Sequence, residues 1–597
     1  MSDRHIFNSA DGLVDKSLRG LITYNPSLGL DPVNRVVFDA RYDKSKVSII
    51  SGGGSGHEPA WSGYVGSNML TASVAGDIFA SPSTSQILAA IEAVPSDAGT
   101  LLVVTNYTGD CLHFGLANEK ALRLGHRCRM IICGDDVAVG RTHGRLVGRR
   151  GLAGQISVLK VLGGAAGESA GSLDDLYDLG TAFSQQIVSI AATLDHCHVP
   201  GRGDHGQLDS NEVEIGTGPH NEPGYKKLSP TPSSNSLVQQ LLSYLLDQND
   251  AERAFAQFDS ADEVVLLVNN FGGISYLEIG ALVEEVLRQL HRDWSVQPVR
   301  VFTGVLESSL NAPAFTLSLI NITAASRACS FSTDQIRKFL DAKTDTHWES
   351  MAGSQSGQAS RQVRTTAVPP PVKSKMENGT HQATRVDMAL MRRMVLAACN
   401  AVIEAEPDLT RWDTVMGDGD CGETLKTGAL NIIDRLCSPD IADCGSVLEV
   451  LEEVEAVVER KMGGTLGGIL DIFLVALTNG VRNEAASGRA SSVASIWGPA
   501  LSSAITHLGV YTKARVGDRT VMDVLIPFSE SMASGDFDHA VSAAVKGAET
   551  TKSLRPKLGR ATYVAAGVDE NSELPPDPGA WGVMVAIRGL QSGFRGD

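Results

Sequence analysis

The segment Val47–Pro59, VSIISGGGSGHEP, joins a short β-branched run to three consecutive glycines and a histidine. Similar runs at Leu101–Thr105, Met130–Cys133 and Val264–Asn269 are each followed by a Gly, Asn or Asp turn and then a longer amphipathic stretch. This alternation is typical of parallel sheets flanked by helices, whose ligands bind beyond the carboxyl ends of the strands. We therefore predict an α/β fold for the first half of the chain, with a binding site at these strand ends.

The glycines after Val47–Ile50 form the first candidate site, because three glycines let the backbone approach a ligand closely. A phosphate-binding P-loop would end in GK[ST], and a dinucleotide fingerprint would not place His57 and Pro59 at the start of its helix. An ordinary strand–helix turn is the alternative. The histidine that directly follows the glycines favours a ligand site.

Two more segments carry reactive side chains, Asn106–Asp110 (NYTGD) and Glu214–Gly224 (EIGTGPHNEPG). Asp110 either caps a helix or projects a carboxylate into the cleft of His57. His220 lies in a turn rich in Gly and Pro, where a surface histidine is the alternative. An imidazole and a carboxylate can polarise a carbonyl and move a hydroxyl proton, and an imidazole can also add to a carbonyl.

The second half of the chain shows apolar residues at helical spacing, for example over residues 388–402 and 447–458, and predicts an all-helical domain. The segment Gly353–Thr384 is rich in Ser, Gln, Thr and Pro and predicts an inter-domain linker.

The segment Trp412–Gly422, WDTVMGDGDCG, places Asp413, Asp418 and Asp420 within eight positions. Carboxylates this close repel one another, and hard divalent cations bound through oxygen relieve the repulsion. An EF-hand would need a glutamate where Ala429 stands. The pattern therefore favours magnesium with nucleotide phosphates over an EF-hand, and a solvated acidic turn is the alternative.

Three glycine-bearing turns follow, at Met462–Thr465, Gly517–Thr520 and Asp577–Ala580. The two glycines of the first turn could offer N–H groups at a helix start, with a helix C-cap as the alternative. Arg519 is a candidate for stabilising charge on a transferring phosphoryl group.

Composition narrows the function further. Of the 597 residues, 51 are Lys or Arg and 69 are Asp or Glu, so the net charge of −18 argues against nucleic-acid binding. A phosphorylated small ligand is compatible with this charge when metal ions supply local positive charge. The nine cysteines form no CxxC pair, and we find no apolar leader and no apolar run of membrane length. We therefore expect a cytoplasmic protein without a membrane partner.

Taken together, the motifs resemble those of ATP-dependent dihydroxyacetone kinases in their single-chain form. SGGGSGHEP, NYTGD, GRRGLAG (148–154), the EIG–G–H–EPG segment and VNNFGG (268–273) resemble the substrate half, and WD–GDGDCG, MGGT, GDRT and DPGA resemble the nucleotide half. The resemblance implies a dihydroxyacetone-binding domain of two α/β subdomains at 8–345, a linker at 346–385 and an ATP-binding eight-helix barrel at 386–590.

The resemblance implies that His220 holds dihydroxyacetone as a hemiaminal on its C2 carbonyl, with His57 and Asp110 in acid–base roles. The residues implied to line the triose site are Gly54, Ser55, Gly56, His57, Thr105 and Asp110. The family usually has Lys at the position of Thr105.

The nucleotide half is implied to bind ATP with two Mg²⁺ ions on Asp413, Asp418 and Asp420. The residues implied to surround the nucleotide are Cys421, Gly422, Glu423, Thr424, Thr465, Leu466, Arg519, Thr520, Asp577, Pro578 and Gly579. The chain also differs from the family at Pro219, in place of Ile, and at Leu466, in place of a hydroxyl residue.

The activity implied is transfer of the ATP γ-phosphate to dihydroxyacetone, with D-glyceraldehyde as a further acceptor, by a homodimer. An FAD-AMP cyclising lyase activity is one alternative. A triose-sensing regulator without turnover is another, and the intact aspartates Asp413, Asp418 and Asp420 argue against it.

Overall fold

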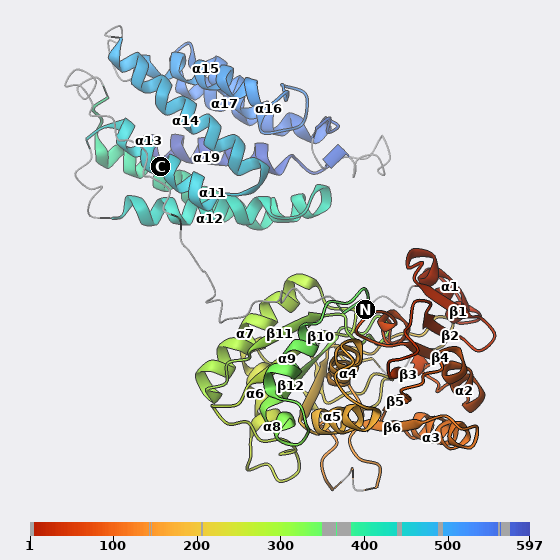
Figure 1. Cartoon of the computed structure of the whole chain (residues 1–597). Helices are drawn as coiled ribbons and strands as arrows, with labels where there is room; N and C mark the ends of the chain where they lie inside the picture. Colours follow the sequence, from red (N-terminus) through yellow and green to blue (C-terminus); the bar gives the residue numbers. More distant parts are fainter. Residues whose placement is uncertain are drawn as a thin grey trace. The chain divides into compact units, whose positions relative to one another are not determined.

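The computed structural model of the chain describes residues 5–142, 144, 146–203, 207–348, 366, 384–438, 445–487, 494–558, 561–562 and 574–596 (Figure 1). The chain divides into two compact units, Met1–Thr365 and Thr366–Asp597. The expected linker, residues 346–385, lies largely outside the described residues.

The first unit contains a six-stranded sheet with the order β1-β2-β4-β3-β5-β6. Its strands are β1 (Leu28–Asp31), β2 (Val36–Asp39), β3 (Ser48–Ser55), β4 (Ala72–Ile78), β5 (Thr100–Thr105) and β6 (Cys128–Cys133). The four strands from β4 to β6 run parallel, as predicted from the alternating pattern. Their carboxyl ends therefore lie at one edge of the sheet.

A second six-stranded sheet has the order β11-β10-β12-β7-β8-β9. Its strands are β7 (Ile187–Thr193), β8 (Val213–Ile215), β9 (Lys226–Leu228), β10 (Val264–Asn270), β11 (Arg300–Gly304) and β12 (Ala314–Asn321). Among the described strands of this sheet only β10 and β11 pair in parallel, so the prediction of a parallel sheet is wrong here. Every position of β10 and β12 is buried, and a strand buried on both faces has the same apolar run whichever way its neighbours point.

Helices cover both sheets. They are α1 (Leu13–Tyr24), α2 (Thr84–Ala93), α3 (Thr108–Arg123), α4 (Ile156–Gly167), α5 (Leu173–Gln185), α6 (Ser234–Leu246), α7 (Tyr276–Trp294), α8 (Ile322–Arg327) and α9 (Thr333–Asp341). Leu266 and Val268 of β10 pack in the cluster of α6 and α7, whereas Val265 and Leu267 pack in the cluster of α4 and α5.

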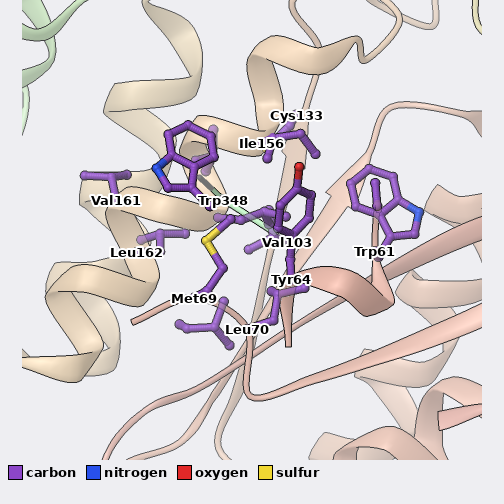
Figure 2. Packing of buried hydrophobic residues seen from close by; sticks show 14 of the residues in the cluster. Trp61, Tyr64, Met69, Leu70, Val103, Cys133, Ile156, Val161, Leu162 and Trp348 are labelled. Carbon is purple, nitrogen blue, oxygen red and sulfur yellow. The ribbon is translucent and has the colours of Figure 1, made fainter. Parts of the chain in front are cut away.

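One hydrophobic cluster contains side chains from both sheets and fixes one sheet against the other. Figure 2 shows its centre, where Tyr64 and Met69 gather with Val161 and Leu162 of α4. The helix approaches so closely that a Cβ on Gly163 would clash with the backbone of Met69. The strand ends of the two sheets are thus held in one rigid frame.

The second unit is helical, and within its described residues no strand is found, in agreement with the prediction. Its helices are α11 (Met388–Met416), α12 (Cys421–Leu436), α13 (Val447–Lys461), α14 (Gly464–Ala486), α15 (Ala494–Tyr511), α16 (Met522–Met532), α17 (Phe537–Thr550) and α19 (Pro578–Arg595). Helix α14 is long and apolar enough to cross a membrane. It packs against α13 and α15, and its residues Phe473, Leu477 and Val481 belong to the core of this unit.

Candidate active site

The glycines of Gly52–Ser55 continue strand β3 and do not form the turn that the sequence indicated. The reason is the segment that follows the neighbouring strand β4: a Cβ on Gly54 would lie 2.8 Å from the backbone nitrogen of Ala80 and 3.0 Å from the Cα and the carbonyl carbon of Phe79. The absence of side chains therefore lets the end of β3 lie against the segment after β4. The chain turns at Gly56, with φ of 97°, and presents His57.

His57 and His220 face each other although 163 positions separate them. Their Nε2 atoms lie 3.0 Å apart, and their ring centroids 4.8 Å apart at an interplanar angle of 84°. Nδ1 of His57 lies 3.0 Å from the carbonyl oxygen of Ser308. Phe79 stacks on the His57 ring, and Tyr107 meets the His220 ring edge-on. Burial, with the neighbouring His220 as a second cause, lowers the pKa of His57 to about 3.

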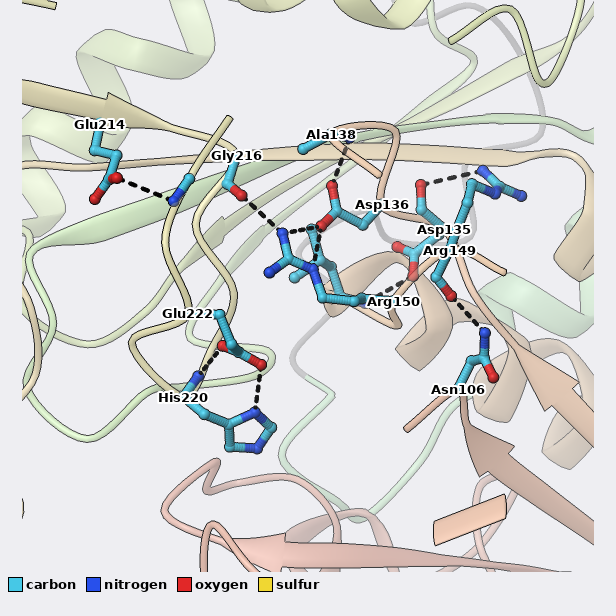
Figure 3. Close-up of polar contacts among 12 residues, drawn as sticks. Asn106, Asp135, Asp136, Ala138, Arg149, Arg150, Glu214, Gly216, His220 and Glu222 are labelled. Carbon is cyan, nitrogen blue, oxygen red and sulfur yellow. Dashed lines mark hydrogen bonds and ion pairs between the residues drawn. The ribbon is translucent and has the colours of Figure 1, made fainter. Parts of the chain in front are cut away.

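Glu222, which sequence reasoning did not single out, contacts His220 twice (Figure 3). Its Oε2 accepts a hydrogen bond of 2.7 Å from the His220 backbone N–H, and its Oε1 lies 3.0 Å from Nδ1 of the His220 ring. Burial disfavours the charged carboxylate, but the contacts with His220 outweigh burial and lower the pKa of Glu222 to about 2. The two-residue spacing of a histidine and a glutamate in a glycine-rich turn was the signal in the sequence.

Asp110 lies in the first turn of α3 and does not cap the helix, whose N-cap is Tyr107. Burial raises the pKa of Asp110 to about 6, and a hydrogen bond with Ser81 and the nearby His220 oppose this rise. Oδ1 of Asp110, Oγ1 of Thr105 and the hydroxyl of Tyr107 are buried and have no hydrogen-bond partner among the described residues. Orphaned polar atoms of this kind fit a ligand that carries several hydroxyl groups.

The loop 305–313, between β11 and β12, holds both histidine-bearing segments. Its Ser308 N–H donates to the carbonyl of His57 at 3.0 Å, and the Ser309 hydroxyl donates to the carbonyl of Pro219 at 2.5 Å. The second sheet thus sets the position of a histidine that follows a strand of the first sheet.

Asn269, from the VNNFGG motif, holds this loop in turn. Its Oδ1 accepts hydrogen bonds from the N–H groups of Leu306 (2.8 Å) and Glu307 (3.0 Å), and its Nδ2 donates to the Glu307 carbonyl at 2.9 Å. The motif therefore has a structural task one step away from the histidines.

Arg150, from the GRRGLAG motif, anchors the segment that carries His220 (Figure 3). The guanidinium pairs with the fully buried Asp136 at 2.7 Å and donates to the Gly216 carbonyl at 2.7 Å. The segment begins its turn at Gly216, with φ of 81°. A buried ion pair that also binds the backbone gives the turn one fixed conformation.

The acidic cluster of the second unit comes from the connection between α11 and α12. Asp413, Asp418 and Asp420 each offer a carboxylate oxygen, and these atoms lie within 4.8 Å of one another. Oδ2 of Asp413 also accepts a hydrogen bond of 3.0 Å from the N–H of Cys421. Three carboxylates at this separation fit hard divalent cations such as Mg²⁺.

The residues expected around the nucleotide all lie at helix starts. Cys421, Gly422, Glu423 and Thr424 form the first turn of α12, Thr465 and Leu466 lie in the first turn of α14, Arg519 and Thr520 precede α16, and Asp577, Pro578 and Gly579 begin α19. These starts lie close together: a Cβ on Gly464 would be 3.8 Å from Oδ2 of Asp420, and one on Gly579 would be 3.6 Å from Leu466 and 4.0 Å from Val521. Gathered helix N-termini favour bound phosphates.

The side chain of Arg519 is buried, with 2 % of the residue exposed. Its backbone has a positive φ of 58° in the turn before α16. Its Nη2 donates to the carbonyl of Pro575 at 2.7 Å, while Nε and Nη1 have no hydrogen-bond partner among the described residues. Asp577 caps α19 through the N–H of Ala580 at 2.8 Å, and burial raises its pKa to about 6. Asp523, which sequence reasoning missed, holds the turn of Arg519 through the N–H groups of Gly517 and Thr520.

Comparison with known proteins finds a family match in each of the two units. A Dak1 domain matches residues 19–348, and a DAK2 domain matches residues 415–592. The dihydroxyacetone kinase of Pichia angusta is 40 % identical over 100 % of this chain and 99 % of its own length. The chain belongs to the dihydroxyacetone kinase family. The human relative, a triokinase/FMN cyclase, is 31 % identical over 99 % of both chains.

Among solved structures of the family, the dihydroxyacetone kinase of C. freundii in complex with AMP-PNP and Mg²⁺ matches with a TM-score of 0.62. It is 28 % identical, and the match covers 100 % of both chains. This chain shares with that structure an α/β N-terminal part followed by a helical C-terminal part.

Proposed function

We infer that this chain is an ATP-dependent dihydroxyacetone kinase, which transfers the γ-phosphate of ATP to dihydroxyacetone. D-glyceraldehyde is a further acceptor in this proposal. The observation that carries it is the meeting of His57, His220 and a buried carboxylate in one place, in a chain that also has a three-carboxylate cluster. The first set suits capture of a carbonyl compound, and the second suits a nucleoside triphosphate.

Nε2 of His220 adds to the C2 carbonyl and holds the triose as a hemiaminal, while His57 handles the proton of the carbonyl oxygen. Asp110, whose pKa is raised to about 6, is ionised at neutral pH and accepts the proton of the hydroxyl that is phosphorylated. The remaining residues of the proposed triose site are Gly54, Ser55, Gly56 and Thr105. Glycerol has no carbonyl, so the covalent anchor excludes it.

In this proposal Asp413, Asp418 and Asp420 hold two Mg²⁺ ions. The separation of their carboxylate oxygens fits divalent cations, and the number of two ions is taken from the family resemblance. When bound, the ions neutralise charge on the ATP phosphates. The helix starts direct N–H groups to the same phosphates, and the two unpartnered nitrogens of Arg519 supply positive charge. Cys421, Gly422, Glu423, Thr424, Thr465, Leu466, Thr520, Asp577, Pro578 and Gly579 complete the proposed nucleotide site.

We further propose the domain limits 8–345, 346–385 and 386–590, two α/β subdomains in the first domain and an eight-helix barrel in the last. The proposed assembly is a homodimer, and the proposed location is the cytoplasm. The six-stranded sheet on each side of the shared core supports the two subdomains.

A coupled assay of ADP release tests the proposal with dihydroxyacetone, D-glyceraldehyde, glycerol and FAD as separate substrates. We expect turnover with dihydroxyacetone and none with glycerol, and absence of turnover with dihydroxyacetone at saturating Mg-ATP would sink the proposal. His220→Ala should lose both the triose adduct and turnover. Asp418→Asn should lose turnover but keep the adduct, because the two sites lie in different units.

A further inference from the structure

Glu222 is the carboxylate whose oxygens contact both the backbone and the ring of His220. We propose that Glu222 is a positioning residue that fixes the tautomer of His220 and balances the positive charge of the triose adduct. This inference rests on the proposed function, because it concerns the histidine that captures the triose.

The protons of the histidine pair can be counted from its three contacts. The carbonyl oxygen of Ser308 and the ionised carboxylate of Glu222 accept hydrogen bonds and cannot donate them, so Nδ1 of His57 and Nδ1 of His220 both carry hydrogen. Both Nε2 lone pairs then point at each other over 3.0 Å, and a bridging proton is needed between them. Two neutral imidazoles together carry two N–H hydrogens, and both of these lie on the Nδ1 atoms. The bridging proton is therefore a third, and it gives the pair one positive charge.

This extra proton balances the addition step. The Nε2–H bond of His220 breaks as His57 Nε2 takes the proton, and the freed Nε2 lone pair of His220 forms the bond to C2. The π electrons of the carbonyl move to its oxygen, which receives the proton from His57 and becomes a hydroxyl. His57 ends neutral, and the ring of His220, bonded at Nε2 and protonated at Nδ1, carries the positive charge.

Glu222 faces that charge directly, with Oε1 3.0 Å from Nδ1 of His220. The other charged groups near the ring are differently engaged. Asp110 is nearby but makes no hydrogen bond with the ring that the described residues show, and Arg150 is paired with Asp136. Glu222 therefore acts on the ring of His220 as the aspartate of a Ser–His–Asp triad acts on its histidine. It orients the ring and stabilises its cation.

Glu222→Gln separates this role from a merely structural one, because an amide keeps one oxygen for the His220 backbone N–H at 2.7 Å. Its NH₂ then faces Nδ1 and forces the hydrogen of His220 to Nε2, the tautomer that cannot attack a carbonyl. Nitrogen-15 NMR of the ligand-free full chain reads the tautomer. We expect hydrogen on Nδ1 of His220 in the wild type and on Nε2 alone in Glu222→Gln.

Adduct formation is measured with [2-¹³C]dihydroxyacetone without nucleotide, from the loss of the carbonyl carbon signal. We expect Glu222→Gln to weaken the adduct by about 100-fold, and formate to restore part of it in Glu222→Ala. The matched control is Glu214→Gln: Glu214 also accepts from a backbone N–H, that of Gly224 at 3.0 Å, and lies near His196. This control should bind the triose within about threefold of the wild type, which is a small energetic change.

Two results would overturn the inference: an adduct in Glu222→Gln that is as strong as in the wild type, or a wild-type His220 without hydrogen on Nδ1. Absence of an adduct in the wild type would instead refute covalent capture, which belongs to the proposed function. The NMR comparison of free Glu222→Gln with the wild type still decides the role of Glu222 in that case.

Discussion

Asp110 is buried with a carboxyl oxygen that has no partner among the described residues, so its charge costs stability. The pKa of Asp110 is about 6 in the folded chain against 3.8 for the ordinary group, because burial disfavours the charged form. Between these pH values the folded state binds more protons than the unfolded state, so stability from this group rises as the pH falls from 6 to 3.8. Above pH 6 the full cost is present.

We therefore predict that Asp110→Asn stabilises the first unit at pH 8 by about 2 kcal/mol, since each pKa unit corresponds to about 1.4 kcal/mol. The gain should shrink below pH 6 and vanish near pH 4, while turnover is lost at every pH. Urea unfolding at pH 8, 6 and 4 measures the effect. Asp175→Asn is the control, because contacts with Ser172 lower the pKa of Asp175, and its change at pH 8 should be destabilising. No gain for Asp110→Asn at pH 8 would contradict the prediction.

Single reactive residues were largely predictable from the sequence, but their partners were not. His57, His220 and the three aspartates stand in glycine-bearing turns, and that local pattern is visible in the chain. Glu222 and Asp523 were missed because their roles depend on which N–H groups the fold brings to them. A carboxylate in a turn looks the same whether it caps a backbone or binds water.

At the scale of elements, the loop 305–313 depends on Asn269. Truncation to alanine leaves the N–H groups of Leu306 and Glu307 without their acceptor inside the protein. We predict that Asn269→Ala destabilises the first unit by about 2–4 kcal/mol and weakens the triose adduct about tenfold, since one loop holds both histidines. Thermal unfolding and the carbon-13 titration measure the two effects.

Asn321→Ala is a matched control for this loop. Asn321 is equally buried at the end of β12, and its side chain accepts from Ala324 N–H at 2.8 Å and donates to the Gln257 carbonyl at 2.8 Å. We expect a similar loss of stability with an unchanged adduct. Equal weakening of the adduct in both variants would mean that general loosening, rather than the loop, displaces the histidines.

The start of α14 gives a second prediction at this scale. Gly464 has φ of 70° and open space around its Cβ position, with Oδ2 of Asp420 as its neighbour at 3.8 Å. Gly464→Ala should raise the KM for Mg-ATP about tenfold, because the strained turn moves N–H groups away from the phosphates. Gly535→Ala is the control: its φ is 78° and nothing lies within 4 Å of its Cβ position. Both changes should cost about 1–2 kcal/mol of stability, and only the first should change the KM.

Elements were predictable where their periodicity is one-sided. The amphipathic helices α11 and α13 begin at Met388 and Val447, where their apolar spacing starts. The direction of β12 was not predictable, because its eight buried positions carry no face preference. The extension of β3 through Gly52–Ser55 was also missed, since glycine is unfavourable in strands unless another backbone lies against it.

At the scale of the whole molecule, a net charge of −18 must be compatible with ATP. The net charge of the whole chain does not oppose phosphate binding if helix N-termini, Arg519 and cations set a positive local potential at the binding site. The sequence indicated two functional halves from motifs alone. Phosphoryl transfer requires the captured triose and the donor phosphate to meet. Whether the two halves that meet belong to one chain or to two chains is a property of the assembly.

The proposed homodimer can work in cis, with both sites of one reaction on one chain, or in trans, with the triose site of one chain and the nucleotide site of the other, and we predict trans. Heterodimers isolated through two different tags decide between them. We predict that a heterodimer of His220→Ala with Asp418→Asn keeps about half of the wild-type activity, because one of its two sites combines an intact triose half with an intact nucleotide half. The same heterodimer is inactive if catalysis is in cis.

A heterodimer of the double variant with the wild type reverses both outcomes: it is inactive in trans and half-active in cis. Failure to recover any chain pair through both tags contradicts the dimer itself, so the pair of measurements separates assembly from catalysis.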